Sequence, residues 1–153
     1  MLVYQTLPEA DITCLDYSTD MMGQAQEKAD RQHLKDKTFL QGDVGALPYA
    51  DGTFDIVLSL NGFHAFPDKE AAYREVFRVL RPGGTFCDCF YVMGEYKRTD
   101  WFVRHAYEKT GFFTPPYETV DSLKVRPEEM YDAVEIANVK GIAWFVCRKG
   151  EKL

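Results

Sequence analysis

The sequence predicts an α/β protein with a doubly wound, mostly parallel sheet that ends in an antiparallel hairpin. Short apolar runs alternate with stretches of helical periodicity along the chain. One run, Phe54–Leu60, is almost entirely apolar, which is typical of a parallel strand that helices cover on both faces. The last two runs, 133–139 and 142–148, are joined at Lys140-Gly141, as expected for a hairpin.

The first part of the chain predicts two strands with a helix between them. Ile12–Asp16 is a short apolar run that ends in an acid, and Thr38–Leu40 is a second strand before the turn at Gly42-Asp43. The helix begins after Ser18, a good N-cap residue, with Asp20 in its first turn. Apolar side chains then recur at helical spacing at Met21, Met22, Ala25 and Ala29.

The remainder predicts three more helices and a further strand. Asp68 caps a helix that Pro82-Gly83-Gly84 ends, and Thr85–Val92 is the strand after that turn. A third helix is expected over Asp100–Lys109, and a fourth near Thr119–Met130 that Pro127 interrupts or offsets. The core-facing stripe of the helix capped by Asp68 consists of Ala72, Tyr73, Val76, Phe77 and Leu80.

Composition narrows the class of protein. A chain of 153 residues with 46% hydrophobic and 27% charged residues is typical of one globular domain, here 1–153. Its net charge of −6 argues against a protein that binds nucleic acid through an overall positive charge. No apolar run approaches the ~20 residues that a membrane-spanning helix needs, so no membrane partner is expected.

The four cysteines indicate a reducing compartment. Cys14, Cys87, Cys89 and Cys147 all lie in apolar, β-rich runs, where cysteine is usually a small buried side chain. Roles in a metal site or a disulfide are the alternative, although no metal-ligand spacing is present. We therefore expect structural thiols, no metal and a cytoplasmic location.

Acidic side chains end two of the predicted strands, where ligands of such sheets bind. Asp16 could accept hydrogen bonds from both hydroxyls of a ribose, although for this residue alone a plain turn aspartate is the simpler explanation. Asp43 could accept one from an adenine amino group, whereas Gly-Asp alone is simply a turn. Asn61 and His64 follow Phe54–Leu60 at the mouth of the same cleft.

From Ile12 to Phe86 the sequence resembles class I S-adenosylmethionine-dependent methyltransferases, in particular the ubiquinone- and menaquinone-biosynthesis type (methyltransferase type 11). The matching text is CLDYSTDMMGQAQEKA, then FLQGDVGALPYADGTFDIVLSLNGFHAF, then EVFRVLRPGGTF. The resemblance implies a Rossmann-like fold, S-adenosylmethionine as cofactor and a small-molecule acceptor. A nicotinamide-dependent dehydrogenase fits the LRPGG and GD-x3-LP stretches poorly.

The resemblance also implies roles for single residues. Asp16 would bind the ribose hydroxyls, Tyr17 would lie along the ribose or adenine, and Met22 would border the adenine. Asp43, with the Val44 backbone, would read the adenine edge. Asn61 would approach the methionine moiety, and Phe63 and His64 would face the transferred methyl group or the acceptor.

One part of the family pattern is not found before Ile12: the first strand and the glycine-rich turn of the E/D-x-G-x-G-x-G type. We expect a truncated domain that lacks the family's first strand and holds the methionine end of the cofactor weakly. Strands Ile12–Asp16 and Phe54–Leu60 would then have open edges. They could pair directly, recruit the Leu2–Thr6 run, or pair with another chain, so a homodimer through the sheet edges is expected.

The candidate catalytic residues are His64 and Tyr91. His64 is the only histidine expected near the cleft and could take a proton from the acceptor, although it could equally cap a loop or pack. Tyr91, at a strand end, is the candidate acceptor-site hydroxyl. A group of aromatic residues is either core packing or an acceptor pocket: Phe90, Tyr91, Trp101, Phe102, Tyr107, Phe112 and Phe113.

Two functions follow as hypotheses. The first is S-adenosylmethionine-dependent methyl transfer to a small molecule. The alternative is a non-catalytic, truncated methyltransferase-fold protein with weak or no cofactor binding.

Overall fold

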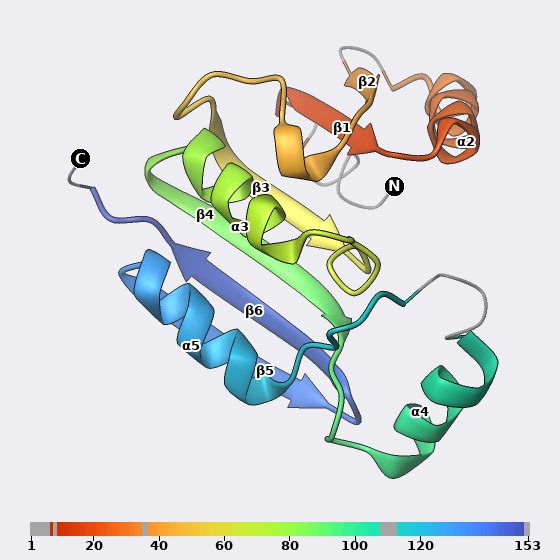
Figure 1. Cartoon of the computed structure of the whole chain (residues 1–153). Coiled ribbons are helices and arrows are strands. Elements are labelled where there is room, and N and C mark those ends of the chain that lie inside the picture. The colour runs from red at the N-terminus through yellow and green to blue at the C-terminus, as the bar shows by residue number, and fades with distance from the viewer. Residues whose placement is uncertain (1–6, 8, 35–36, 108–112, 152–153) are drawn as a thin grey trace. The chain divides into compact units, whose positions relative to one another are not determined.

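The computed structural model describes residues 7, 9–34, 37–107 and 113–151 (Figure 1). The chain forms two compact units, residues 1–48 and 49–153. Each unit has a sheet of its own: two strands in the first and four in the second.

The first unit is a parallel strand pair with one helix. It contains β1 (Ile12–Asp16), α2 (Thr19–Arg31), β2 (Lys37–Gln41) and a short 3-10 helix, η1 (Val44–Ala46). The two strands run parallel, with Asp16 opposite Gln41. The predicted N-cap is confirmed, because the Ser18 hydroxyl accepts a hydrogen bond from the Met21 amide at 3.3 Å.

The second unit contains a four-stranded mixed sheet in the order β3-β4-β6-β5. These strands are β3 (Phe54–Leu60), β4 (Leu80–Tyr91), β5 (Ala133–Val139) and β6 (Ile142–Arg148). β3 and β4 are parallel, and β5 and β6 form the predicted antiparallel hairpin. Its turn residues Lys140 and Gly141 both have positive φ angles, 53° and 85°, as in the turns that suit the twist of a hairpin.

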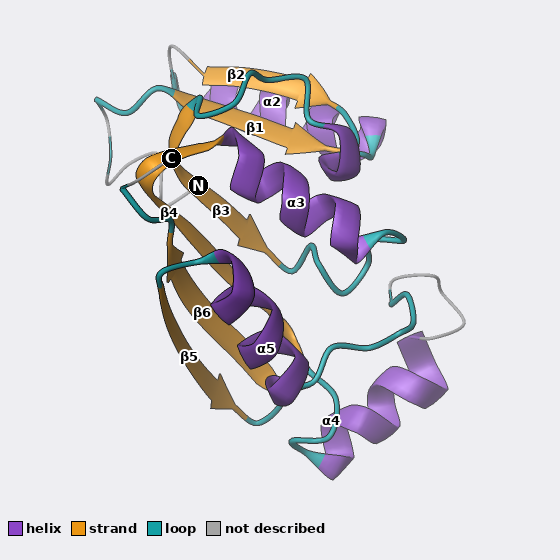
Figure 2. Ribbon diagram, turned by 60° about the vertical axis from the view of Figure 1, so that its left-hand side comes forward, coloured by secondary structure: helices purple, strands orange, loops and turns teal. Residues whose placement is uncertain are grey.

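Helices α3 (Lys69–Val79) and α5 (Val120–Met130) both cover the same face of this sheet (Figures 1 and 2). The core lies between them and the sheet and is largely aromatic. Asp68 caps α3 as predicted, with its carboxylate accepting a hydrogen bond from the Ala71 amide at 2.9 Å. The largest side chains that are fully buried in this core are Phe63, Tyr73, Phe86, Phe90 and Phe145.

The prediction that helices cover both faces of β3 is wrong. Ile56, Leu58 and Leu60 alternate along one face of the strand and are 59%, 46% and 63% exposed. The reason is that α3 and α5 lie on one face only, and β3 pairs only with β4 in the described part of the sheet.

The turn predicted at Pro82-Gly83-Gly84 is instead part of β4, which begins at Leu80. The register shifts from Phe54 opposite Leu80 to Ile56 opposite Thr85, so the extra residues form a bulge. Gly83 has a φ of 74°, and its amide donates a hydrogen bond to the Lys149 carbonyl at 3.1 Å. A side chain at Gly84 would place its Cβ 2.8 Å from the Arg81 carbonyl oxygen. The backbone conformation at Gly83 and the close contact at Gly84 thus both favour glycine.

Two helices differ in detail from the prediction. The helix expected over Asp100–Lys109 begins earlier, as α4 (Lys97–Phe102), and continues as a π-helix, η2 (Val103–Tyr107); Lys109 lies outside the described residues. α5 runs without interruption through Pro127, which lies in its last turn. Only one helical hydrogen bond is lost there, the one that a proline nitrogen cannot donate.

The α/β class is confirmed, but direct pairing of Ile12–Asp16 with Phe54–Leu60 is not seen, because β1 and β3 belong to different sheets. The Leu2–Thr6 run lies outside the described residues. Within the described ranges, no helix combines the length and the apolar character needed to cross a bilayer.

Candidate functional site

In the first unit, two carboxylates share one edge of the strand pair. Asp16 ends β1, and Asp43 follows β2, so parallel pairing brings them to the same edge. The Gly42 amide donates a hydrogen bond to the Asp16 carbonyl at 3.0 Å, which joins the two strand ends. This edge is the carboxyl end of the strands, where ligands of α/β sheets bind.

Each carboxylate uses one oxygen to hold its own loop. Asp16 Oδ1 accepts a hydrogen bond from the Ser18 amide at 2.8 Å, and Asp43 Oδ1 accepts one from the Gly45 amide, also at 2.8 Å. The second oxygen of each accepts no hydrogen bond from the part of the chain that the structure describes. Both acids therefore serve as turn residues and still offer an acceptor to a ligand.

The other predicted cofactor contacts of this unit follow the two acids in sequence. Tyr17 is 78% exposed, directly after Asp16. Met22 lies half-buried on α2, and Val44 half-buried at the start of η1. An exposed ring and two half-buried apolar side chains thus follow the two carboxylates in sequence.

In the second unit, a pocket of about 520 Å³ lies where β3 and β4 end. It brings together the three predicted residues Asn61, His64 and Tyr91. This volume is in the range of small-molecule sites. Within the described ranges, no lining residue carries a formal charge at neutral pH; the rest of the lining is Thr99, Phe102, Val103, Tyr107, Phe113 and Ile142.

Asn61 is held at the pocket by an unusual backbone. Its φ is 56°, a region that asparagine tolerates better than most residues. The backbone amide of Asn61 donates a hydrogen bond to the Cys89 carbonyl at 2.8 Å. The side chain is exposed at the end of β3.

His64 is a neutral imidazole against an aromatic wall. Its ring lies 4.4 Å from that of Phe113 between centroids, and its Nδ1 is buried without a hydrogen-bond partner in the described residues. Burial lowers the pKa of His64, and the positive charge of Lys69 lowers it further. At neutral pH the ring can therefore accept a proton, although as a weaker base than an ordinary histidine.

Tyr91 is only 4% exposed, and its hydroxyl donates a hydrogen bond to Asp100 Oδ1 at 2.7 Å. Burial raises the pKa of Tyr91, and the hydrogen bond to Asp100 raises it further. The phenol therefore stays protonated. Because its hydrogen points to Asp100, the phenol oxygen is free to accept a hydrogen bond.

The expectation that Phe63 faces the methyl group or acceptor is wrong. Phe63 is fully buried, with its ring centroid 4.9 Å from that of Phe66 and 4.4 Å from that of Tyr73. The chain turns at Asn61, and Phe63 fills the core below the pocket.

The members of the aromatic group are divided between the core and the wall of the pocket. Phe90 is fully buried in the core. Trp101 is 56% exposed, and Phe112 lies outside the described residues. The wall of the pocket is formed by Tyr91, Phe102, Tyr107 and Phe113.

Two charged residues near the pocket were not predicted. Asp100 holds the Tyr91 hydroxyl, yet in sequence it is an ordinary acid near a helix start. Lys69 is 7% exposed, and its Nζ donates hydrogen bonds to the carbonyls of Phe66 at 3.3 Å and Thr114 at 2.7 Å. Beside the Asp68 cap, this lysine resembles any surface lysine in sequence.

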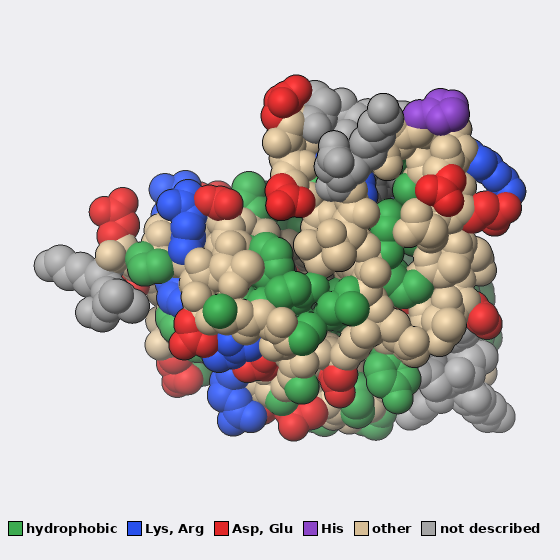
Figure 3. Space-filling view, turned by 90° about the horizontal axis from the view of Figure 1, so that it is seen from above, with side chains coloured by type: hydrophobic (Ala, Val, Ile, Leu, Met, Phe, Trp, Pro, Cys, Tyr) green, Lys and Arg blue, Asp and Glu red, His purple; other side chains and the backbone are tan. Residues whose placement is uncertain are grey.

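All four cysteines are free thiols, and Cys14, Cys87 and Cys89 are half-buried rather than buried as predicted. Cys147 is buried, and burial raises its pKa to about 12. The described ranges contain no cluster of three potential metal ligands. On the face shown in Figure 3, acidic and basic side chains are interspersed around exposed hydrophobic ones.

Comparison with known proteins agrees with this geometry. Residues 2–87 match a methyltransferase domain family. The demethylmenaquinone methyltransferase of Thermus thermophilus is 38% identical over 84 residues, which are 55% of this chain and 38% of that protein. The matches to the first three curated relatives span only about a third of their lengths, between 31% and 38%.

Solved structures share the fold at low sequence identity. The YcgJ protein of Bacillus subtilis superimposes with a TM-score of 0.73 at 17% identity, over 92% of this chain and 82% of that one. The [4+2]-cyclase SpnF superimposes with a TM-score of 0.74 at 16% identity, over 97% of this chain and 70% of that one. Fold likeness alone therefore does not settle the reaction. The family match covers more than half of the residues, and on that ground the chain belongs to the family of methyltransferase domains.

Proposed function

We propose that this protein transfers a methyl group from S-adenosylmethionine to a small-molecule acceptor. The observation that carries the proposal is the pair of strand-end carboxylates, Asp16 and Asp43, each with one oxygen left for a ligand. Membership of the methyltransferase domain family and similarity to demethylmenaquinone methyltransferases support it.

The first unit would hold the adenosine part of the cofactor. Asp16 would accept hydrogen bonds from the ribose hydroxyls, and Asp43 with the Val44 backbone would read the adenine edge. Tyr17 and Met22 would lie along the rings. In the second unit, Asn61 would contact the methionine part of the cofactor. When bound, the cofactor supplies a sulfonium methyl group that is already activated for transfer.

The pocket of the second unit would hold the acceptor. Its uncharged aromatic wall would align the acceptor, and alignment is the main requirement for displacement from an activated donor. Tyr91 would accept a hydrogen bond from the acceptor, since its own hydrogen points to Asp100. His64, neutral at pH 7, would take a proton from an acceptor that arrives protonated.

Calorimetric titration with S-adenosylhomocysteine tests the cofactor assignment. We expect micromolar binding, and a loss of about tenfold or more in Asp16→Ala, because hydrogen bonds to a carboxylate contribute about 1.5–3 kcal/mol. Asp11→Ala is the control, since Asp11 is an exposed aspartate that directly precedes β1, whereas Asp16 is half-buried at its end. Absence of heat at millimolar ligand would contradict the proposal and favour a non-catalytic protein.

We further propose a homodimer through the open edge of β3 and a cytoplasmic location. β3 pairs with β4 alone within the described sheet, and its sequence FDIVLSL has neither proline nor lysine to block pairing at the other edge. Four free thiols are consistent with a reducing compartment.

Sedimentation equilibrium tests the dimer. We expect a dimer at micromolar concentration and a monomer for Leu58→Lys, because the new charges would face each other across a symmetric strand pair. Leu58 is 46% exposed, so the substitution should not disturb folding. Val125→Lys, at a 59% exposed position on α5, should remain dimeric. A monomeric wild-type chain would exclude this edge interface.

A further inference from the structure

Residues 96–107, which include α4 and η2, form a surface that the proposed reaction does not explain. Four aromatic side chains in this segment are exposed to solvent: Tyr96 at 37%, Trp101 at 56%, Phe102 at 55% and Tyr107 at 47%. Exposed aromatic residues so close together in the chain are unusual for a surface that faces only water. Trp and Tyr are the side chains enriched where proteins meet the headgroup region of a bilayer.

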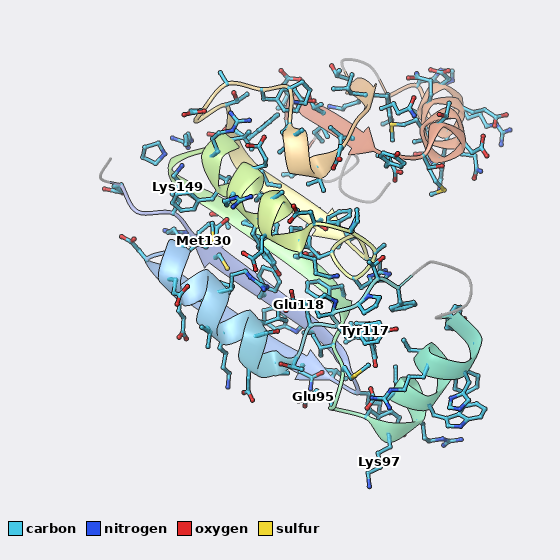
Figure 4. All side chains as sticks on the ribbon, viewed as in Figure 1. Glu95, Lys97, Tyr117, Glu118, Met130 and Lys149 are labelled. Atoms are coloured by element: carbon cyan, nitrogen blue, oxygen red, sulfur yellow. The ribbon has the colours of Figure 1, made fainter. Side chains whose placement is uncertain are left out.

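The same segment is basic within an acidic chain. It carries Lys97, Arg98 and Arg104 against the single acid Asp100, a net charge of +2, whereas the whole chain carries −6. All three basic side chains are exposed, and none forms an ion pair with the residues that the structure describes. Lys97 points away from the body of the fold (Figure 4).

The segment is joined to the rest of the second unit by side-chain hydrogen bonds and one buried residue. Val103 is 3% exposed and fixes the helix to the second unit. The Trp101 ring stacks on His105, with 4.7 Å between centroids and 17° between planes. Thr99, Phe102, Val103 and Tyr107 also line the pocket, so the exposed segment forms one wall of its opening.

We propose that residues 96–107 dock reversibly on a membrane surface that contains anionic lipids. The three basic side chains would attract the lipid headgroups, and the aromatic side chains would enter the interface. Such docking needs no spanning helix, so the absence of an apolar run of ~20 residues does not exclude it. It would bring the opening of the pocket, whose described lining carries no charge, to the bilayer, where apolar molecules dissolve.

Nucleic acid is the less favoured partner for this surface. The three basic side chains would attract either polyanion, so their charge does not separate the two partners. The pocket beside them lacks charged lining residues in its described part, which suits an apolar molecule better than a phosphate. The two partners are separated by the test below.

The test measures vesicle binding without methyl donor or acceptor, so its result is independent of the proposed reaction. The full chain carrying Trp144→Phe leaves Trp101 as the only tryptophan. We expect its emission to shift to shorter wavelength, and the protein to co-sediment, with phosphatidylcholine vesicles that contain about one third phosphatidylglycerol. Phosphatidylcholine alone should bind at least about tenfold more weakly.

Charge reversal tests the role of the basic side chains, and the same charge change elsewhere on the chain is the control. Lys97→Glu with Arg98→Glu should weaken vesicle binding by about 25-fold or more, because each basic residue near an anionic surface contributes about fivefold. Lys28→Glu with Lys124→Glu changes the net charge equally at exposed positions elsewhere and should bind like wild type. The proposal is overturned if Lys97→Glu with Arg98→Glu binds vesicles as tightly as the wild type does. It is also overturned if the wild type binds no vesicles, or if it shifts single-stranded RNA in a gel and does not bind vesicles.

Discussion

Asp88 is a carboxyl group inside the core of the second unit. It is 3% exposed on the inner face of β4, between Phe86 and Phe90. Its Oδ1 accepts a hydrogen bond from the Cys89 amide at 2.7 Å, while Oδ2 is buried with no partner in the described residues. Burial raises the pKa of Asp88 to about 8. The native fold therefore holds this group protonated at neutral pH.

Asp88 makes stability fall as the pH rises. The unfolded chain releases this proton near pH 4 and the folded chain only near pH 8, so unfolding releases a proton throughout that window. We predict that Asp88→Asn removes this slope and raises the free energy of unfolding at pH 7.5 by about 1–3 kcal/mol. Urea denaturation from pH 4.5 to 8.5 measures it. Asp11→Asn, at an exposed position, should keep the wild-type slope.

His64 should titrate below the ordinary histidine value of about 6.5. Phe113→Ala should raise its pKa, because removing the ring that lies 4.4 Å away lets water reach the imidazole. NMR titration of the ring proton, assigned with His64→Gln, follows both values. An unchanged midpoint in Phe113→Ala would mean that the pocket wall does not control this group.

At the level of elements, the hairpin turn is a place where sequence and backbone are poorly matched. Lys140 has a φ of 53°, which is strained for lysine and natural for asparagine. We predict that Lys140→Asn raises the free energy of unfolding by about 0.5 kcal/mol and increases the melting temperature. Lys124→Asn, on the exposed side of α5, should instead lower it slightly through helix propensity.

Strand and helix positions were predicted well because they depend on local patterns. The period-two and period-3.6 spacing of apolar residues located β3, α3 and the β5–β6 hairpin, and cap residues such as Ser18 and Asp68 located helix starts. What covers an element is a property of the whole fold. The run FDIVLSL therefore predicted the strand correctly and its two covered faces wrongly.

The site was predicted in part for the same reason. Asn61 and His64 follow β3, and Tyr91 ends β4. Topology brings the ends of these parallel strands together, so the meeting of the three residues at one pocket could be foreseen. Lys69 and Asp100 act through partners that are distant in the sequence or not suggested by it. Phe63 shows the limit of the family resemblance, since one turn of chain at Asn61 moves a side chain from pocket to core.

For the whole molecule, burial differs sharply between the two units. Among the described residues, Ala29 is the only buried hydrophobic residue of the first unit, while the second unit contains an extensive aromatic core. A two-stranded sheet is marginally stable by itself. The carboxylates proposed to hold the cofactor thus lie in the less stable unit.

Hydrogen exchange should reveal this difference. We predict that amides of β1, β2 and α2 exchange about 100-fold or more faster than those of β4 and β6, because local opening costs less where little apolar surface is buried. Mass spectrometry of peptic fragments measures both sets in one experiment. Equal protection in the two units would show that they open as one cooperative structure.

Asp16 and Asp43 are proposed to hold the adenosine part of S-adenosylmethionine. The amides of Ser18 and Gly45 report on it directly, since each donates a hydrogen bond to one of these carboxylates. In an NMR titration with S-adenosylhomocysteine, we predict shifts of these two amide signals that saturate together at micromolar ligand. Signals that stay in place at millimolar ligand, or shifts confined to residues far from both acids, would show that these carboxylates do not hold the ligand.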